Sequence, residues 1–142
     1  MSRSYKFIEH TADIAAELNG SSLEELFSSG ADAWLDSVAD GANFQADDST
    51  EIELSGATAE ELLVTFLNEL NYLLLTQKWL YLSIQNIKIF DDKDGCELSA
   101  ELTGTKLEQN VQLKHEIKSI TYQQIEIVRA DNYYSTIVIF IA

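Results

Sequence analysis

Hydrophobic residues recur at two different spacings along the chain, and each spacing predicts one kind of element. Spacings of three and four residues follow two capping boxes, at 22–25 and 58–61, in which a Ser or Thr precedes a Glu by three positions. Side chains at these spacings share one face of a helix. The pattern therefore predicts two amphipathic helices, one over residues 23–38 and a second that runs to about residue 77.

Alternating apolar and polar residues, which are typical of half-buried strands, fill most of the remaining chain. The expected strands cover residues 5–8, 14–18, 51–54, 79–89, 98–102, 117–127 and 133–140. Polar turns between the later strands make their connections hairpin-like. The order of two strands, helix, strand, helix and four strands favours an α+β fold, in which two amphipathic helices pack on a mixed, mainly antiparallel β-sheet.

Length and composition fit one folded domain. The chain has 142 residues, of which 46% are hydrophobic, and this is enough for a single core. The low hydrophobicity that marks disordered proteins is absent. No internal repeat or linker divides the chain, so we expect a single domain over residues 1–142.

The chain is strongly acidic, and this limits the partners that it can bind. Its 24 Asp and Glu residues against 9 Lys and Arg residues give a formal net charge of -15. Nucleic-acid binding needs Lys and Arg to neutralise phosphates, so direct contact with RNA or DNA is not expected. The same field favours a basic protein surface or a cation, although it also keeps many soluble proteins dispersed.

Cysteine usage and hydropathy predict the compartment. Cys96 is the only cysteine, so it forms no internal disulfide, and no Cys or His lies near it at the spacing of a zinc site. No apolar run approaches the roughly 18 residues that a membrane-spanning helix needs, and the N-terminus lacks a hydrophobic signal core. We therefore expect a cytoplasmic protein with no membrane contact.

The turn from His10 to Asp13 is the densest polar cluster between two expected strands. A carboxylate at a strand boundary can face a cation, and a nearby imidazole can orient it. In the alternative interpretation, Asp13 or Thr11 caps the turn through a backbone hydrogen bond. His115 precedes a later strand, where it could approach the same pocket or be an exposed loop residue.

Five segments, in this order, resemble the archease family: YKFIEHTADI, SSLEELFSSGADAWLD, LLVTFLNELNYLL, HEIKSITY and a closing VIF strand. Together they cover nearly the whole chain. The resemblance implies an archease-like fold and a non-enzymatic accessory role in tRNA splicing or RNA repair. Family members help an RNA ligase to accept guanylate and to turn over repeatedly, so this chain would contact RNA only indirectly, through the ligase.

The resemblance also implies a divalent-cation site, with calcium as the ion. Asp13 corresponds to the metal-binding aspartate of the family, and His10 to the motif histidine beside it. The other family ligands are the last two residues, here Ile141 and Ala142, and His115 is a further pocket candidate. Ile141 stands where an aspartate is expected. Calcium takes about six to eight oxygen ligands, so the loss of one carboxylate should weaken the site.

Two other classes of function remain open. His10, Asp13 and His115 could converge to activate a water molecule, as in a small metal-dependent hydrolase. Alternatively, the acidic surface could serve a chaperone-like module that binds other proteins. The sequence has no nucleophile elbow, phosphate-binding glycine loop, dinucleotide fingerprint or zinc signature, so nothing in it demands an enzyme.

Overall fold

Both helices begin where the capping boxes predict. The computed structural model describes residues 3–8, 13–122 and 125–142. Helix α1 (Leu23–Val38) begins after Ser22, whose hydroxyl accepts a hydrogen bond from the Glu25 amide at 3.1 Å. Thr58 does the same at 3.1 Å for α2 (Ala59–Gln77). Each hydroxyl satisfies an amide that has no partner within its helix. No helix in these described ranges is long and apolar enough to cross a membrane.

The strands form two separate sheets. The first contains, side by side, β1 (Arg3–Ile8), β2 (Ile14–Gly20), β8 (Tyr133–Ile141) and β6 (Ser119–Ile120), and β7 (Val128–Ala130) also pairs with β8. The second contains, in spatial order, β3 (Asp48–Gly56), β5 (Gly95–Lys106) and β4 (Trp79–Asp92). Every pairing between the described strands is antiparallel. A short 3-10 turn, η1 (Gly41–Asn43), precedes β3.

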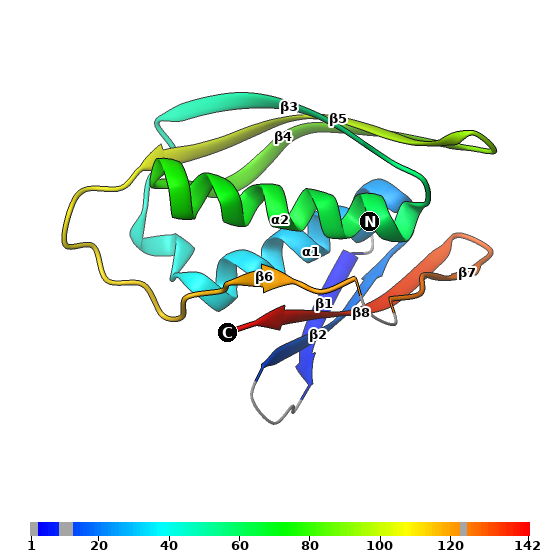
Figure 1. Cartoon of the computed structure of the whole chain (residues 1–142), viewed down its shortest axis with the longest axis horizontal. Helices are drawn as coiled ribbons and strands as arrows, with labels where there is room; N and C mark the ends of the chain where they lie inside the picture. Colours follow the sequence, from blue (N-terminus) through cyan, green and yellow to red (C-terminus); the bar gives the residue numbers. More distant parts are fainter. Residues whose placement is uncertain (1–2, 9–12, 123–124) are drawn as a thin grey trace.

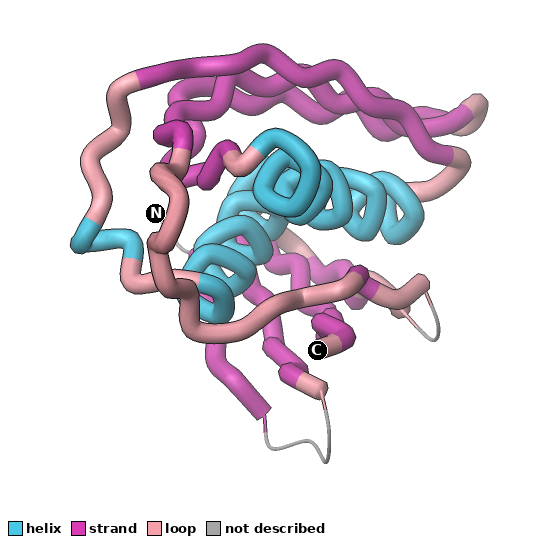
Figure 2. Tube along the Cα trace, turned by 60° about the vertical axis from the view of Figure 1, so that its left-hand side comes forward, coloured by secondary structure: helices cyan, strands magenta, loops and turns pink. Residues whose placement is uncertain are grey.

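The two helices lie between the two sheets, as the layers in Figures 1 and 2 show. Helix α1 contacts mainly β1 and β2, and α2 contacts mainly the strands of the second sheet. The largest fully buried side chains come from all three layers and include Phe27, Trp34, Phe66, Tyr81 and Phe140. Burial of one Phe side chain stabilises the fold by about 1.5–3 kcal/mol. The expected α+β class, with two helices packed on antiparallel sheet, is confirmed, and the structure adds the division into two sheets.

The prediction of one continuous strand over residues 117–127 is wrong. In its place the described chain has only the two-residue strand β6 and, just beyond the range, the three-residue strand β7. Side chains of α2 bond to the backbone in this region: Asn71 and Asn68 bind residues of the 117–120 segment, and Glu60 accepts the Ile127 amide at 3.0 Å. The backbone groups that a continuous strand would have paired with β8 are therefore partly satisfied by a helix.

Candidate functional site

The strand register brings Asp13 to the end of β8. Strand β2 pairs antiparallel with β8, and Ile14 lies opposite Phe140. Asp13 comes one residue before Ile14, so it lies beside the residues that follow Phe140. The Ala142 amide donates a hydrogen bond to the half-buried Asp13, with 3.3 Å between the nitrogen and Oδ1. The structure thus brings together Asp13, Ile141 and Ala142, and their role as metal ligands stays a prediction.

A short segment, residues 117–121, holds the other side of β8, and we call it the strap. The Lys118 amide donates to the Ile141 carbonyl at 2.7 Å, and the Thr121 amide donates to the Ile139 carbonyl at 3.2 Å. Strand β6 lies between these two bonds. The end of β8 therefore lies between Asp13 on one side and the strap on the other.

Two amide side chains of α2 hold the strap from the helix side. Asn68 forms two hydrogen bonds with Ile120: its Nδ2 donates to the carbonyl at 3.1 Å, and its Oδ1 accepts the amide at 2.9 Å. Asn71 Nδ2 donates to the Ile117 carbonyl at 2.7 Å. Positions three residues apart lie on one helix face, so α2 presents both amides to the strap much as a neighbouring strand would present its backbone.

The orientation of Asn71 is set by Trp34, in the core. Trp34 Nε1 donates to Asn71 Oδ1 at 3.0 Å, and Trp34 and Asn71 are 0% and 3% exposed. An indole can only donate, so the oxygen of the amide must face Trp34 and its nitrogen must face the strap. Sequence reasoning missed Asn68 and Asn71 as site residues. Their signal in the sequence was that both lie in the segment LLVTFLNELNYLL, which resembles the archease family.

His115 lies at the same end of the molecule, although no hydrogen bond between the described residues joins it to Asp13. It is exposed, and it borders a hollow of about 280 Å³ together with Ile14, the residue that follows Asp13. The described residues that line this hollow are Phe7, Ile14, Asp36, Ser37, Lys114 and His115. A second hollow, of about 420 Å³, lies between the end of α2 and residues 107–117. The other predicted pocket residue, His10, lies outside the described residues.

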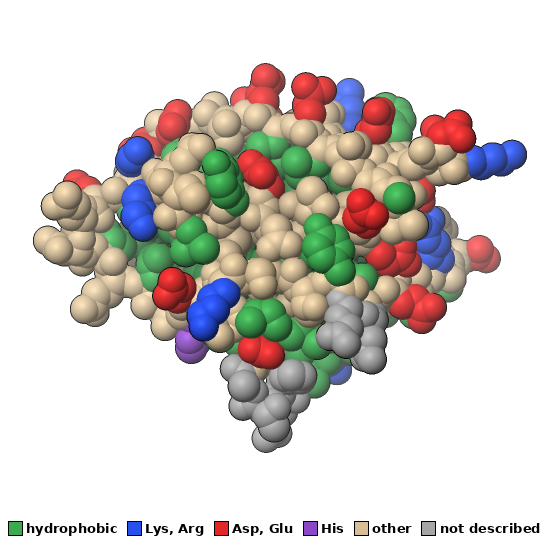
Figure 3. Space-filling model, in the orientation of Figure 1, with side chains coloured by type: hydrophobic (Ala, Val, Ile, Leu, Met, Phe, Trp, Pro, Cys, Tyr) green, Lys and Arg blue, Asp and Glu red, His purple; other side chains and the backbone are tan. Residues whose placement is uncertain are grey.

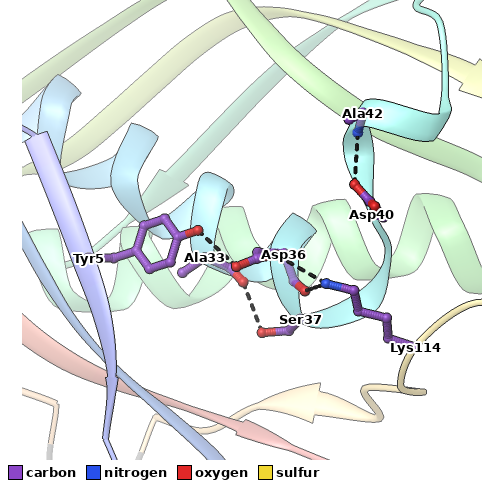
Figure 4. A network of polar contacts seen from close by, with 7 residues as sticks. All are labelled: Tyr5, Ala33, Asp36, Ser37, Asp40, Ala42 and Lys114. Carbon is purple, nitrogen blue, oxygen red and sulfur yellow. Dashed lines mark hydrogen bonds and ion pairs between the residues drawn. The ribbon is translucent and has the colours of Figure 1, made fainter.

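Asp36, near the end of α1, anchors the segment that carries His115 (Figure 4). Its Oδ2 accepts the Tyr5 hydroxyl at 3.0 Å, and its Oδ1 pairs with the Lys114 ammonium at 3.2 Å. Lys114 Nζ also donates to the Asp36 carbonyl at 3.0 Å, and the Lys114 amide donates to the Val38 carbonyl at 2.8 Å. A cation near a helix C-terminus satisfies carbonyls that lack intrahelical partners. Burial, and then the hydrogen bond to Asp36, raise the pKa of Tyr5 to about 12.

The described residues at the end of β8 do not fit a calcium site. Asp13 supplies one side-chain carboxylate, and its Oδ1 already accepts an amide hydrogen. Ile141 has no side-chain oxygen, and its carbonyl accepts the Lys118 amide. Nowhere in the described ranges do three or more His, Cys, Asp or Glu side chains gather as a metal site would require. The function proposed for this protein therefore does not depend on a bound cation, and the expected calcium site stays a prediction.

Comparison with known proteins identifies the family. The model of the archease protein family matches residues 5–140. The chain belongs to the archease family. The archease of Archaeoglobus fulgidus is 32% identical over 136 residues, which cover 95% of this chain and 96% of that protein. The archease of Methanosarcina barkeri is 30% identical over 139 residues, which cover 96% of this chain and 95% of the relative.

Solved structures agree with the archease fold. The solution structure of Methanobacterium thermoautotrophicum protein 1598 matches with a TM-score of 0.81 and 24% identity, over 97% of this chain and 98% of that one. A crystal structure of a Thermotoga maritima archease, described as a possible chaperone, matches with a TM-score of 0.64 and 25% identity, over 96% of each chain. The archease fold expected from the five sequence segments is confirmed.

Proposed function

We propose that this archease is a non-enzymatic accessory protein that binds an RNA ligase and promotes its guanylylation and repeated turnover in tRNA splicing or RNA repair. Family membership over residues 5–140 supports the proposal. The observation that carries it to a site is the contact of Asp13 with Ala142, which joins the family motif to the end of β8. The partner is a protein, and RNA is reached only through it.

The charge distribution supports a basic protein partner. On the outer face of the second sheet, Glu51 lies directly opposite Glu101, and Glu53 and Glu97 lie on the same face. None of the four forms an ion pair within the described residues. Like charges directly opposite each other destabilise a sheet. Figure 3 shows acidic side chains along the upper rim of the molecule, where the second sheet lies, and a basic partner surface would relieve their repulsion.

A sealing assay with the RNA ligase of the same organism tests the proposal. The substrate is an RNA pair with a terminal phosphate, the ligase is present in substoichiometric amount, and labelled GTP reports guanylylation. We expect the wild-type protein to increase both the RNAs sealed per ligase and the guanylylated fraction. Asp13→Ala should lower the stimulation by about tenfold, a change within the usual range of coupling energies.

The matched control for this assay is Asp94→Ala. Asp94 lies in the turn between β4 and β5, so the substitution removes the same charge at a distance from the end of β8. It should stimulate the ligase as the wild type does. Absence of stimulation by the wild-type protein, or equal stimulation by Asp13→Ala, would contradict the proposal.

A chaperone-like function is the second candidate, because the Thermotoga relative is described as a possible chaperone. The two functions separate when the ligase is left out. Suppression of the aggregation of an unrelated unfolding protein, without any effect on ligase turnover, would favour the chaperone. Hydrolysis of a phosphate ester by the protein alone would favour the third possibility, a metal-dependent hydrolase.

Calcium binding is a separate prediction of the family resemblance. The described residues offer few free oxygen ligands. A calcium site with fewer charged ligands binds the ion more weakly. We therefore expect a dissociation constant of about millimolar or weaker. Calorimetric titration with calcium, manganese and magnesium measures it. Micromolar binding that is lost in Asp13→Ala would show that the cation site exists in spite of Ile141.

A further inference from the structure

We infer that Asn68 is a positioning residue, supported by Asn71, that holds the strap and thereby keeps the end of β8 at Asp13. The structural part of this inference is independent of the partner. Its consequence for activity rests on the proposed function, the stimulation of an RNA ligase.

The end of β8 depends on the strap because the β2 ladder stops short of it. The last β2 pairing joins Ile14 to Phe140, so Ile141 and Ala142 lie beyond the ladder. The strap holds Ile141 through the β6 ladder, in which Ser119 lies opposite it, and through the bond from the Lys118 amide to its carbonyl. The Ala142 amide in turn bonds to Asp13. Movement of the strap would therefore shift Ile141 and, with it, the amide that contacts Asp13.

The strap in turn depends on α2. Strand β6 is an edge strand with only two residues, so its own ladder supplies few hydrogen bonds. Asn68 satisfies both backbone groups of Ile120, a residue that lies between the two strap amides that bind β8. Ile117 and Ile120 are 1% and 2% exposed, so apolar packing fixes the depth of the strap. Apolar packing has no direction, whereas the two Asn68 bonds fix the register of the strap along β8.

Asn68 is the better residue to test than Asn71. Replacement of Asn71 would leave the buried Trp34 N–H without its acceptor, and this would destabilise the core for a reason unrelated to the strap. Asn68 bonds only to Ile120 in the described structure. Its replacement by Ala therefore removes the two hydrogen bonds to the strap and leaves the contact between Trp34 of α1 and Asn71 in place.

Amide hydrogen exchange of the full chain, followed by NMR, measures the coupling directly. In Asn68→Ala the Ile120 amide loses its acceptor, so its faster exchange is expected in any case. The informative amide is that of Ala142, which should exchange about tenfold or more faster, because the opening of its contact with Asp13 becomes easier. Asn86→Ala makes the same substitution at an exposed position of β4, and it should leave the Ala142 amide unchanged.

Asn68→Asp adds a graded test that survives if Asn68→Ala fails to fold. The Asp side chain can still accept the Ile120 amide, but it can no longer donate to the Ile120 carbonyl. We expect an Ala142 exchange rate between those of the wild type and Asn68→Ala. If the Ala142 amide exchanges at the wild-type rate in the folded variants while the Ile120 amide is accelerated, the strap does not position β8, and the inference is overturned.

The sealing assay tests the consequence for activity. Asn68→Ala retains Asp13, so we expect a several-fold higher concentration of the protein for half-maximal stimulation of the ligase, with the same stimulation at saturation. Wild-type stimulation by this variant, in spite of faster Ala142 exchange, would overturn the positioning role. If the wild-type protein itself fails to stimulate the ligase, the proposed function fails, and hydrogen exchange still decides the structural inference.

Discussion

Single polar side chains join separate elements at several points of this molecule. Helix side chains that bond to the backbone of another element include Glu24, Glu60, Asn68 and Asn71. Glu24, for example, accepts the Ile89 amide of β4 at 3.1 Å. A buried or half-buried backbone group that lacks a ladder partner is costly, and each of these side chains removes that cost at one position. The layers are therefore aligned by polar contacts as well as by the apolar core.

At the residue scale, the bond between Tyr5 and Asp36 predicts a stability change in alkali. The pKa of Tyr5 is raised to about 12 in the folded protein, by burial first and by Asp36 second, whereas an unfolded tyrosine titrates near its ordinary pKa of about 10. The folded state then binds the proton more tightly, so this contribution is complete below about pH 10 and is lost as the pH rises toward about 12. The free energy of unfolding should fall more steeply above about pH 9 in the wild type than in Tyr5→Phe.

Urea unfolding at fixed ionic strength and several pH values measures this difference in slope. Tyr72→Phe is the control, because Tyr72 is 52% exposed and bonds to no carboxylate in the described structure. It should follow the wild-type curve. Parallel curves for the wild type and Tyr5→Phe up to about pH 11 would show that the fold does not raise the pKa of Tyr5.

The candidate site was predictable only in part. The family resemblance named Asp13, Ile141 and Ala142 as one site, and the strand register places them side by side, while their role as metal ligands stays a prediction. The roles of Asn68 and Asn71 were not predictable. The sequence pattern of a helix is the same whether an Asn side chain faces solvent or forms hydrogen bonds with the backbone of another segment. Only the fold decides which groups lie opposite such a side chain.

At the element scale, local signals predicted the helices, but a tertiary contact changed one strand. The hydroxyls of Ser22 and Thr58 and their glutamates act within four residues, so the helix starts were visible in the sequence. The pattern over 117–127 predicted a strand because it records burial, and Ile117 and Ile127 are indeed buried. Burial alone does not distinguish a residue that faces β8 from one that faces α2.

Gly104 in β5 gives a prediction at the same scale. A Cβ at this position would lie 2.7 Å from the ring of Trp79 and closer still to the Leu80 carbonyl, both on the neighbouring strand β4. The backbone cannot yield without disturbing the ladder between β4 and β5. We expect Gly104→Ala to lower the free energy of unfolding by about 1–3 kcal/mol, the usual cost of overpacking. The urea midpoint at constant slope measures it.

Gly41→Ala is the matched control for Gly104→Ala. Its added Cβ would meet only the end of the Leu35 side chain, at 3.0 Å, and that side chain can move. A loss of less than about 0.5 kcal/mol is expected, as for most surface substitutions. Equal losses at the two positions would show that the contact with Trp79 does not set the cost, because the lower entropy of the unfolded chain after either substitution favours folding.

At the scale of the whole molecule, one ion pair among the described residues connects the two sheets directly. Arg129 of β7 pairs with Asp91 of β4, with 2.9 Å between Nη1 and Oδ2, and its guanidinium lies 5.8 Å from the centre of the Tyr134 ring. Asp91 also accepts the thiol hydrogen of the buried Cys96 at 3.0 Å. This bond and Arg129 lower the pKa of Asp91, and burial, followed by Asp91, raises the pKa of the Cys96 thiol to about 12.

The reactivity of Cys96 therefore reports whether this end of the molecule opens. Only the thiolate attacks a disulfide reagent, and the buried thiol must first be exposed. Arg129→Met removes the link between the sheets while it keeps an apolar stem. Because a partly exposed ion pair contributes about 0.2–1 kcal/mol, we expect Cys96 in the variant to react with dithionitrobenzoate about two- to fivefold faster.

The control for Arg129→Met must remove the same charge, because the reagent is an anion and the protein carries a net charge of -15. Lys88→Met does so on the outer face of the second sheet, where Lys88 forms no ion pair with a described residue. The ratio of the Arg129→Met rate to the Lys88→Met rate therefore corrects for the change in net charge. Arg129 also lowers the pKa of the Cys96 thiol, so its loss reduces the thiolate fraction, and a ratio above one reports opening rather than thiol ionisation. The ratio of these two rates should fall toward one at high salt. Salt weakens the ion pair between Arg129 and Asp91, and only the Lys88→Met protein retains this pair. A ratio of one already at low salt would show that Arg129 does not hold the sheets together, and that Cys96 is protected by the packing of the second sheet alone.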